Sequence, residues 1–238
     1  MKLIDSFGPN PRVVRMFLAE KGITLPSEAV DLLGGENRQA GYLQRNPGGQ
    51  LPALELANGK VIAETAVICE YIEEHHPTPV LVGSTAEERA EARMWQRRVE
   101  LNITENMYNG FRFAEGYELF KNRVHCIPPA AADLKATAQE WLVKLDALIA
   151  GRDFICGNAP RFVDITLYCC MDFAKGVGQA INPELKNVSA WFARMDQRPS
   201  ATSSLHPAWE QIQMRGYFIA AARGFRPRCT SRYISRQT

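Results

Sequence analysis

The chain has 238 residues, of which 46% are hydrophobic and 23% are charged, and its formal net charge at pH 7 is +2. This composition is ordinary for a globular protein, and the length allows one large domain or two of usual size. The near-neutral charge argues against a nucleic-acid partner, and no apolar run approaches the ~18–20 residues of a membrane-spanning helix.

The first part of the chain has the pattern of a small α/β unit. A short strand is expected at residues 2–4, followed by a glycine- and proline-rich turn and a helix. Asn10 is expected to be the N-cap of this helix, with Pro11 in its first turn and Gly22 as its C-cap. The elements expected next are a weak strand at 30–32, an irregular segment at 34–46, a hairpin of strands 51–56 and 60–62 joined by Asn58-Gly59, and a helix from Glu64 to His76.

The rest of the chain is predicted to be helical. A linker rich in proline and glycine spans 77–84, and the expected helices are a long amphipathic run at 85–120, then 130–150 after the break at Ile127-Pro128-Pro129, then 163–176 and 187–197. The predicted organisation is therefore an α/β domain at 1–78, an all-helical domain at 85–222, and a tail at 223–238. The tail holds five arginines and no acidic residue. We expect it to be disordered, with contact to a polyanion as the alternative, and whether it is native stays open.

Cysteine and histidine usage indicates a reducing compartment and no metal site. None of the six cysteines forms a Cys-x-x-Cys pair, and the four histidines do not cluster with them. The N-terminal segment, residues 1–6, places an acidic residue, Asp5, where a signal peptide would be apolar. We therefore expect a cytoplasmic protein with no bound metal.

Four segments, taken in order, resemble the cytosolic glutathione transferase family. They are residues 6–15 with 19–22, residues 46–54, residues 64–72 and residues 151–164. The resemblance implies a thioredoxin-like glutathione-binding domain followed by an all-helical domain, working as a homodimer. It also implies an enzyme that conjugates glutathione to small hydrophobic electrophiles or uses it to reduce peroxides or disulfides. The alternatives are a family isomerase or dehalogenase, and a non-catalytic module that binds glutathione, another ligand or a protein.

The resemblance also implies where glutathione binds. Pro52 is expected to follow a cis peptide bond, so that the main chain of Leu51 pairs with the cysteinyl part of glutathione. Glu64 and Thr65, at a helix N-terminus, are expected to hold the γ-glutamyl ammonium and carboxylate. The alternative for this pair is a plain helix cap with an acid in its first turn.

Three further polar residues belong to the implied glutathione site. Asn37 and Arg38 are expected near the glycyl end of glutathione, where Arg38 can offset the carboxylate. Gln50, in the loop before Pro52, completes the set. For Asn37 and Arg38 the alternative is a solvated loop.

The group that activates the thiol is where this sequence departs from most of the family. No tyrosine stands near the end of the first strand, and Gly8 stands where other members have serine or cysteine. The turn Gly8-Pro9-Asn10 is most similar to the Thr-Pro-Asn turn of the bacterial nu-type enzymes, with glycine in place of threonine. This implies that Asn10 and the positive end of the helix stabilise the thiolate, with Ser6 as the second candidate. The alternatives are an N-cap role for Asn10 and a turn role for Ser6.

An electrophile pocket is expected between the two domains. Its candidate lining residues are Phe7, Met107, Tyr108, Phe111 and Tyr168, although helical aromatic residues are more often part of a core. Arg12 and Arg15 either add positive potential or face solvent. Asp164 is assigned a structural role: it is half of a capping box whose other position is Arg161, so that helix is expected to begin less firmly.

Overall fold

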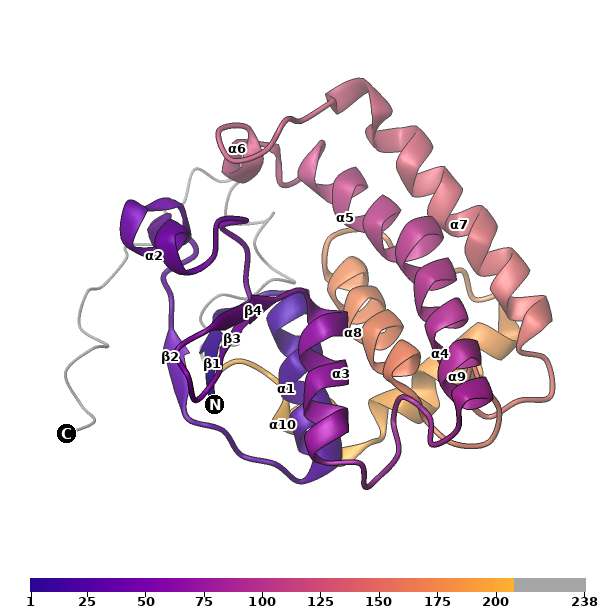
Figure 1. Cartoon of the computed structure of the whole chain (residues 1–238). Helices are drawn as coiled ribbons and strands as arrows, with labels where there is room; N and C mark the ends of the chain where they lie inside the picture. Colours follow the sequence, from indigo (N-terminus) through magenta and orange to yellow (C-terminus); the bar gives the residue numbers. More distant parts are fainter. Residues whose placement is uncertain (208–238) are drawn as a thin grey trace.

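The computed structural model describes residues 1–207, which form an α/β part followed by a helical part (Figure 1). The strands β1 (Lys2–Asp5), β2 (Ser27–Ala29), β3 (Ala53–Glu55) and β4 (Val61–Ala63) make one sheet in the order β2-β1-β3-β4. β1 and β2 are parallel, and helix α1 (Pro9–Lys21) makes the crossover that parallel neighbours require. β3 runs antiparallel to both β1 and β4. The predicted thioredoxin-like unit is confirmed.

The sheet is covered on both faces because successive residues of β1 point to opposite sides. Leu3 belongs to the main hydrophobic core, together with residues of α1 and of α3 (Thr65–His75). Ile4 belongs to a smaller cluster that includes Tyr42 of α2 (Ala40–Arg45). Figure 1 shows α1 and α3 between the sheet and the helical part, with α2 on the other side of the sheet.

The helical part is built around one buried helix, α8 (Phe162–Gly176), which contacts α1, α4, α5 and α9. The other elements are α4 (Ala86–Val99), a π-helical turn at Glu100–Thr104, α5 (Glu105–Arg112), α6 (Tyr117–Phe120), a 3₁₀ turn at Pro128–Ala130, α7 (Ala131–Leu148), α9 (Lys186–Asp196) and α10 (Pro199–Ser203). A single core runs from β1 through α1 and α8 to α9, so the two parts share one packed interior. The all-helical second part is confirmed.

The N-terminus of α1 differs from the prediction. The helix begins at Pro9, and Gly8 is the residue before it, with φ 115° and ψ 169°. Because this φ is rarely open to a side chain, glycine suits the position, and Asn10 becomes the second helical residue rather than the N-cap. The predicted C-cap is confirmed: Gly22 is left-handed, with φ 66°.

Three other boundaries were wrong. The strand expected at 30–32 lies at Ser27–Ala29, where Ala29 pairs with Asp5 at the end of β1. The segment 34–46 is not irregular, because it holds a 3₁₀ turn at Glu36–Arg38 and α2. The long helix ends at Arg112 instead of continuing to residue 120.

Residues 208–222, expected in the helical part, and the tail at 223–238 lie outside the described residues. Within residues 1–207, no helix combines the length and apolar character needed to cross a membrane.

Candidate functional site

A cavity of about 180 Å³ lies between the α/β part and the helical part. Its walls are the start of α1, two loops of the α/β part, α5, the α5–α7 connection and α8. The lining residues are Phe7, Gly8, Pro9, Asn10, Pro11, Leu32, Leu33, Asn37, Arg38, Gly49, Gln50, Leu51, Tyr108, Phe111, Arg112, Leu119, Phe120, Val124, Phe173 and Val177. Seven of these residues are aromatic or proline, and others, such as Asn37 and Arg38, are polar. The cavity therefore suits a ligand with both polar and apolar portions.

The positive end of α1 faces this cavity. Pro9 and Pro11 have no N–H, and the N–H of Arg12 donates to the carbonyl of Gly8 at 3.2 Å. The N–H of Asn10 is therefore the only amide donor in the first three helical positions. Neither that N–H nor the Asn10 side chain has a hydrogen-bond partner within residues 1–207. A helix end with an unpaired donor is suited to stabilise an anion, such as a thiolate.

The loop before β3 presents a free stretch of main chain beside α1. The peptide bond between Leu51 and Pro52 is cis, as the resemblance implied. Pro52 is buried and does not line the cavity, whereas Leu51 does. Within the described residues, the main-chain N–H and C=O of Leu51 have no hydrogen-bond partner. An extended peptide can therefore pair with Leu51 in the manner of an added strand.

Side chains from the 3₁₀ turn, from α2 and from the residue that follows α2 hold this loop in place. Asn37 Nδ2 donates to the carbonyl of Gly49 at 2.6 Å. The carbonyl of Gln50 accepts from the Tyr42 hydroxyl at 2.6 Å and from Asn46 Nδ2 at 2.8 Å. These bonds occupy carbonyls on one side of the loop and leave Leu51 unpaired on the other.

Asn37 has a feature that the sequence did not reveal. The residue is 2% exposed, and its Oδ1 has no hydrogen-bond partner in the described structure. Buried amide oxygens are nearly always paired, so an unpaired one in a cavity wall points to a ligand donor. Arg38, the next residue, is exposed and also lines the cavity.

Glu64 and Thr65 lie beside the same loop but outside the cavity lining. Ala63, the last residue of β4, pairs with Ala53, the first residue of β3. Glu64 comes directly after Ala63, so it lies next to the loop that leads into β3. Glu64 has φ 72° and ψ 125°, the one positive φ of a non-glycine residue in the described structure. Such a conformation is costly, and it is common at ligand-binding turns. The Thr65 hydroxyl has no partner within residues 1–207, so it is available at the positive end of α3.

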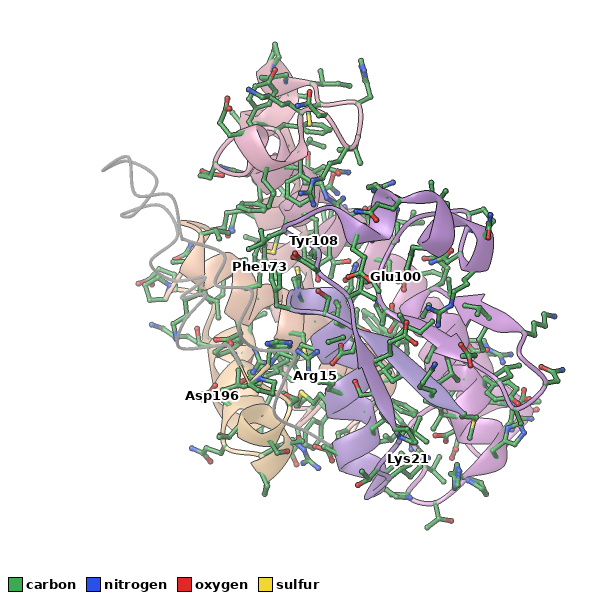
Figure 2. All side chains as sticks on the ribbon, turned by 90° about the vertical axis from the view of Figure 1, so that its left-hand side faces the viewer. Arg15, Lys21, Glu100, Tyr108, Phe173 and Asp196 are labelled. Carbon is green, nitrogen blue, oxygen red and sulfur yellow. The ribbon has the colours of Figure 1, made fainter. Side chains whose placement is uncertain are left out.

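The far wall of the cavity is aromatic. Phe111 of α5 meets Phe173 of α8 edge-on, with ring centroids 5.0 Å apart. The ring centroid of Tyr108 lies 6.0 Å from that of Phe173, and both residues are labelled in Figure 2. Phe120, from α6, packs 6.0 Å from Phe111. Burial raises the pKa of the Tyr108 phenol well above its usual value, so this hydroxyl stays neutral at physiological pH.

The structure places three of the predicted site residues outside the cavity lining. The Ser6 hydroxyl donates to the carbonyl of Val30 at 2.9 Å, and Ser6 is 3% exposed and does not line the cavity. Met107 and Tyr168 are both 1% exposed and belong to the core. The Tyr168 hydroxyl donates to Asp196 at 2.7 Å, away from the cavity.

Met107 and Tyr168 were expected in the cavity wall and lie in the core for the same geometric reason. Residues on a helix advance by about 100° each, so neighbours in sequence face different directions. Tyr108 lines the cavity, whereas Met107 faces Cys170 in the core. On α8 the cavity residue is Phe173, five positions beyond Tyr168 and about 140° around the helix.

The sequence analysis did not name the lining residues that come from the segment after β2 and from the α5–α7 connection. Leu32 and Leu33 follow β2, and Arg123 donates to both of their carbonyls at 2.6 and 2.9 Å. These bonds tie the α5–α7 connection to the α/β part. The overlooked lining residues from the two connections and the two helix ends are Leu32, Leu33, Arg112, Leu119, Phe120, Val124, Phe173 and Val177.

Arg12 and Arg15 do not face solvent. Arg12 pairs with Asp172 of α8 at 2.5 Å, and Arg15 pairs with Asp5 of β1 at 2.6 Å. Both arginines also donate to the segment after α9, Arg12 to the carbonyl of Ala201 and Arg15 to the carbonyl of Ser204. They join the two parts of the molecule behind the cavity, and neither lines it. Within residues 1–207, no group of histidine, cysteine or acidic side chains is arranged to hold a metal ion.

Comparison with known proteins agrees with this geometry. A model of the glutathione S-transferase N-terminal domain matches residues 7–75, and a model of the C-terminal domain matches residues 129–199. Glutathione S-transferase 2 of Saccharomyces cerevisiae is 30% identical over 205 residues, which cover 83% of this chain and 86% of that protein. Maleylacetoacetate isomerase of Pseudomonas aeruginosa is 30% identical over 200 residues, covering 83% and 88%.

The same relationship is found among solved structures. The crystal structure of Gtt2 from Saccharomyces cerevisiae superposes with a TM-score of 0.81 at 29% identity, covering 86% of this chain and 100% of that one. Both family domains therefore occur here in order, and relatives match over most of their own length. The chain belongs to the glutathione S-transferase family.

Proposed function

We propose that this chain is an enzyme that joins the sulfur of glutathione to small hydrophobic electrophiles. The observation that carries the proposal is the unpaired N–H of Asn10 at the positive end of α1, which lines the same cavity as the unpaired main chain of Leu51. One element can hold the cysteinyl part of glutathione while the other stabilises its sulfur.

The proposed glutathione position follows the polar groups of the α/β part. Thr65 and the free N–H groups of α3 bind the γ-glutamyl carboxylate, and Glu64 accepts from the ammonium. Leu51 pairs with the cysteinyl amides. Arg38 neutralises the glycyl carboxylate, and Asn37 Oδ1 accepts an N–H of the ligand. The electrophile then occupies the aromatic wall formed by α5 and α8.

Thiol activation in this proposal is electrostatic. A thiol with a pKa near ~8.5 is mostly protonated at neutral pH, and a nearby positive helix end lowers that pKa. Asn10 offers both its main-chain N–H and its side-chain amide to the sulfur. The ionised sulfur attacks the electrophilic carbon, and the leaving group departs with its electron pair. The likeness of the Gly8-Pro9-Asn10 turn to the nu-type enzymes stays a prediction, as does glutathione-dependent reduction of peroxides or disulfides.

A non-catalytic role is the second candidate. Tyr108 is the only residue with a hydroxyl or thiol in the cavity lining of the described structure, and it stands on α5 rather than beside α1. A family member without a hydroxyl or thiol beside the bound sulfur can keep ligand binding without turnover. In that case the chain binds glutathione or another ligand, or serves as a protein-interaction module.

Turnover and binding measurements on three variants test the proposal. We expect calorimetry to give micromolar-to-millimolar glutathione binding to the wild type, weakened in Thr65→Ala. We expect Asn10→Ala to lower kcat with 1-chloro-2,4-dinitrobenzene about 10²-fold, as removal of a transition-state donor does, and Ser6→Ala to lower it much less. Equal activity in wild type, Asn10→Ala and Ser6→Ala would remove Asn10 from the mechanism. Glutathione binding without any turnover would favour the non-catalytic role.

Dimerisation and a cytoplasmic location are further parts of the proposal. Val67 of α3 and Met94 of α4 are 50% and 42% exposed, and the ion pair between Arg93 and Glu70 joins these two helices at 2.9 Å. Apolar side chains on adjoining helices support a self-association surface there. The five cysteines described, which are Cys69, Cys126, Cys156, Cys169 and Cys170, are free thiols, which suits a reducing compartment.

A further inference from the structure

The residues that line the cavity carry a net positive charge. Its charged lining residues within the described structure are two arginines, Arg38 and Arg112, and no aspartate or glutamate is among them. The two arginines come from different parts of the molecule. Arg38 lies at the end of the 3₁₀ turn of the α/β part, and Arg112 is the last residue of α5.

Glutathione accounts for only one of these arginines. Arg38 is close to the loop that contains Gly49, since a Cβ on Gly49 would lie 3.0 Å from the Arg38 guanidinium. Under the proposed function, Arg38 therefore serves the glycyl carboxylate. The γ-glutamyl carboxylate has its own partners at Thr65 and α3. Arg112 remains, on the wall that the electrophile occupies.

The surroundings of Arg112 leave most of its positive charge available to a ligand, because no buried carboxylate among residues 1–207 is paired with it. Its guanidinium carbon lies 5.7 Å from the ring centroid of Tyr108 and 5.8 Å from that of Phe120. It donates to Asn109 Oδ1 at 2.9 Å. Its nearest carboxylate is Glu105 at 3.8 Å, and the Glu105 side chain is 53% exposed. Solvent screens such a pair, so Glu105 offsets little of the positive charge that the cavity receives.

We propose that Arg112 selects electrophiles that carry a carboxylate on an aromatic or conjugated frame. This inference rests on the proposed function and names its substrate class. The planar guanidinium matches a carboxylate in a two-point hydrogen bond, and the flanking rings favour a flat substrate. The reacting carbon then lies toward Asn10 and the glutathione sulfur, while the acid group lies against α5.

The chemistry is a substitution in which all atoms balance. For a chloroarene, glutathione thiolate forms the S–C bond to the ring carbon, and the C–Cl bond breaks as chloride leaves with its electron pair. The thiol proton passes to solvent. The carboxylate of the substrate is unchanged, because its role is binding at Arg112.

A matched pair of substrates tests the inference. We would measure kcat/KM for 4-chloro-3,5-dinitrobenzoate and for the corresponding benzamide, which has nearly the same shape and no charge. Each variant is compared with the wild type on the same substrate, so the different intrinsic reactivities of the two compounds cancel. We expect Arg112→Gln to lose about tenfold or more with the acid and less than about twofold with the amide.

Two further variants separate recognition from structure. Glu105→Gln leaves Arg112 in place and removes its competing carboxylate, so we expect kcat/KM with the acid to rise about twofold, without a rise for the amide. Arg97→Gln, an exposed arginine on α4, is the matched control and should alter neither substrate. These effects require a folded protein, so glutathione KM and the thermal midpoint are measured for each variant.

The outcomes are distinguishable. Equal losses with acid and amide in Arg112→Gln would overturn the inference while leaving the transferase function intact. A raised glutathione KM instead of a substrate-selective loss would assign Arg112 to glutathione and also overturn it. Absence of turnover with either compound in the wild type, despite activity with 1-chloro-2,4-dinitrobenzene, would overturn the substrate class. Absence of turnover with all three compounds would contradict the proposed function itself.

Discussion

A few polar side chains determine the shape of the loop at residues 49–52 that lines the cavity. Asn37, Tyr42 and Asn46 each donate to a carbonyl of residues 49–50, and none of the three belongs to the sheet that the loop enters. These bonds satisfy the carbonyls of Gly49 and Gln50. The main chain of Leu51, the next residue, is therefore held in place before a ligand binds. Binding then costs less loop ordering than it would in a mobile segment.

Asn37→Ala tests this arrangement at the residue scale. The substitution removes the bond to Gly49 and the buried acceptor Oδ1, so we expect the glutathione Kd to rise about tenfold, equivalent to about 1.4 kcal/mol. We expect kcat at saturating glutathione to change much less, because Asn37 does not reach the sulfur in this proposal. Calorimetry and steady-state kinetics measure the two quantities. Gln44→Ala, an exposed amide on α2, is the control, and an unchanged Kd in Asn37→Ala would assign the residue no part in binding.

At the scale of an element, the start of α8 depends on one carboxylate. A serine or threonine at position 161 would accept a hydrogen bond from the main-chain N–H of Asp164, and an arginine side chain has no acceptor for it. The Arg161 guanidinium instead donates to the carbonyl of Val80. Asp164 Oδ2 accepts from the Arg161 N–H, and Oδ1 accepts from the Ile155 N–H and from Trp191 Nε1. The helix therefore keeps half of the capping box and adds two bonds from the core. It begins with more support than the sequence suggested.

Burial raises the pKa of Asp164 from 3.8 to about 6, although its three donors favour the ionised form. Between these values the folded state binds more protons than the unfolded state, so the contribution of this carboxyl to stability falls as pH rises. Asn at this position does not titrate. We therefore expect Asp164→Asn to destabilise the protein by about 2 kcal/mol or more at pH 5, and by roughly 1 kcal/mol less at pH 7.5.

Urea unfolding of wild type and Asp164→Asn at the two pH values measures this difference. Asp153→Asn is the control, because the Asp153 side chain is 58% exposed and its loss should cost little at either pH. A deficit for Asp164→Asn that is the same at pH 5 and pH 7.5 would show that its pKa is not raised.

At the scale of the whole molecule, the two parts are joined behind the cavity by buried charge. Arg12 and Arg15 leave α1 and reach Asp172 of α8 and the carbonyls of Ala201 and Ser204 (Figure 2 labels Arg15). Buried ion pairs add little net stability, but removing one partner leaves an uncompensated charge. These contacts therefore hold the helical part against α1 behind the cavity.

The proposed dimer is tested at the same scale. Val67→Glu puts a charge on the exposed apolar surface of α3, so we expect light scattering to give half the wild-type mass at micromolar concentration. Val143→Glu is the matched control on α7, where the valine is 55% exposed. A monomeric wild type would contradict dimerisation. A dimer that survives Val67→Glu and dissociates in Val143→Glu would move the interface to α7.

Local chemistry was sufficient for much of the fold. The Asn58-Gly59 hairpin, the end of α1 at Gly22 and the start of α3 at Thr65 each depend on a turn or cap that a short stretch of sequence specifies. The cis bond before Pro52 followed from the family resemblance. The cavity-lining residues Asn10, Asn37 and Leu51 were also named from that resemblance.

The sequence by itself therefore determined the order of elements, the family and the polar side of the cavity. The tertiary structure decided the apolar side, placing Phe120, Phe173 and Arg112 there and keeping Met107 and Tyr168 in the core. The physical reason is that an error of one residue turns a helical side chain by about 100°, and a helix buried on all sides, such as α8, shows no polar face from which its orientation could be read.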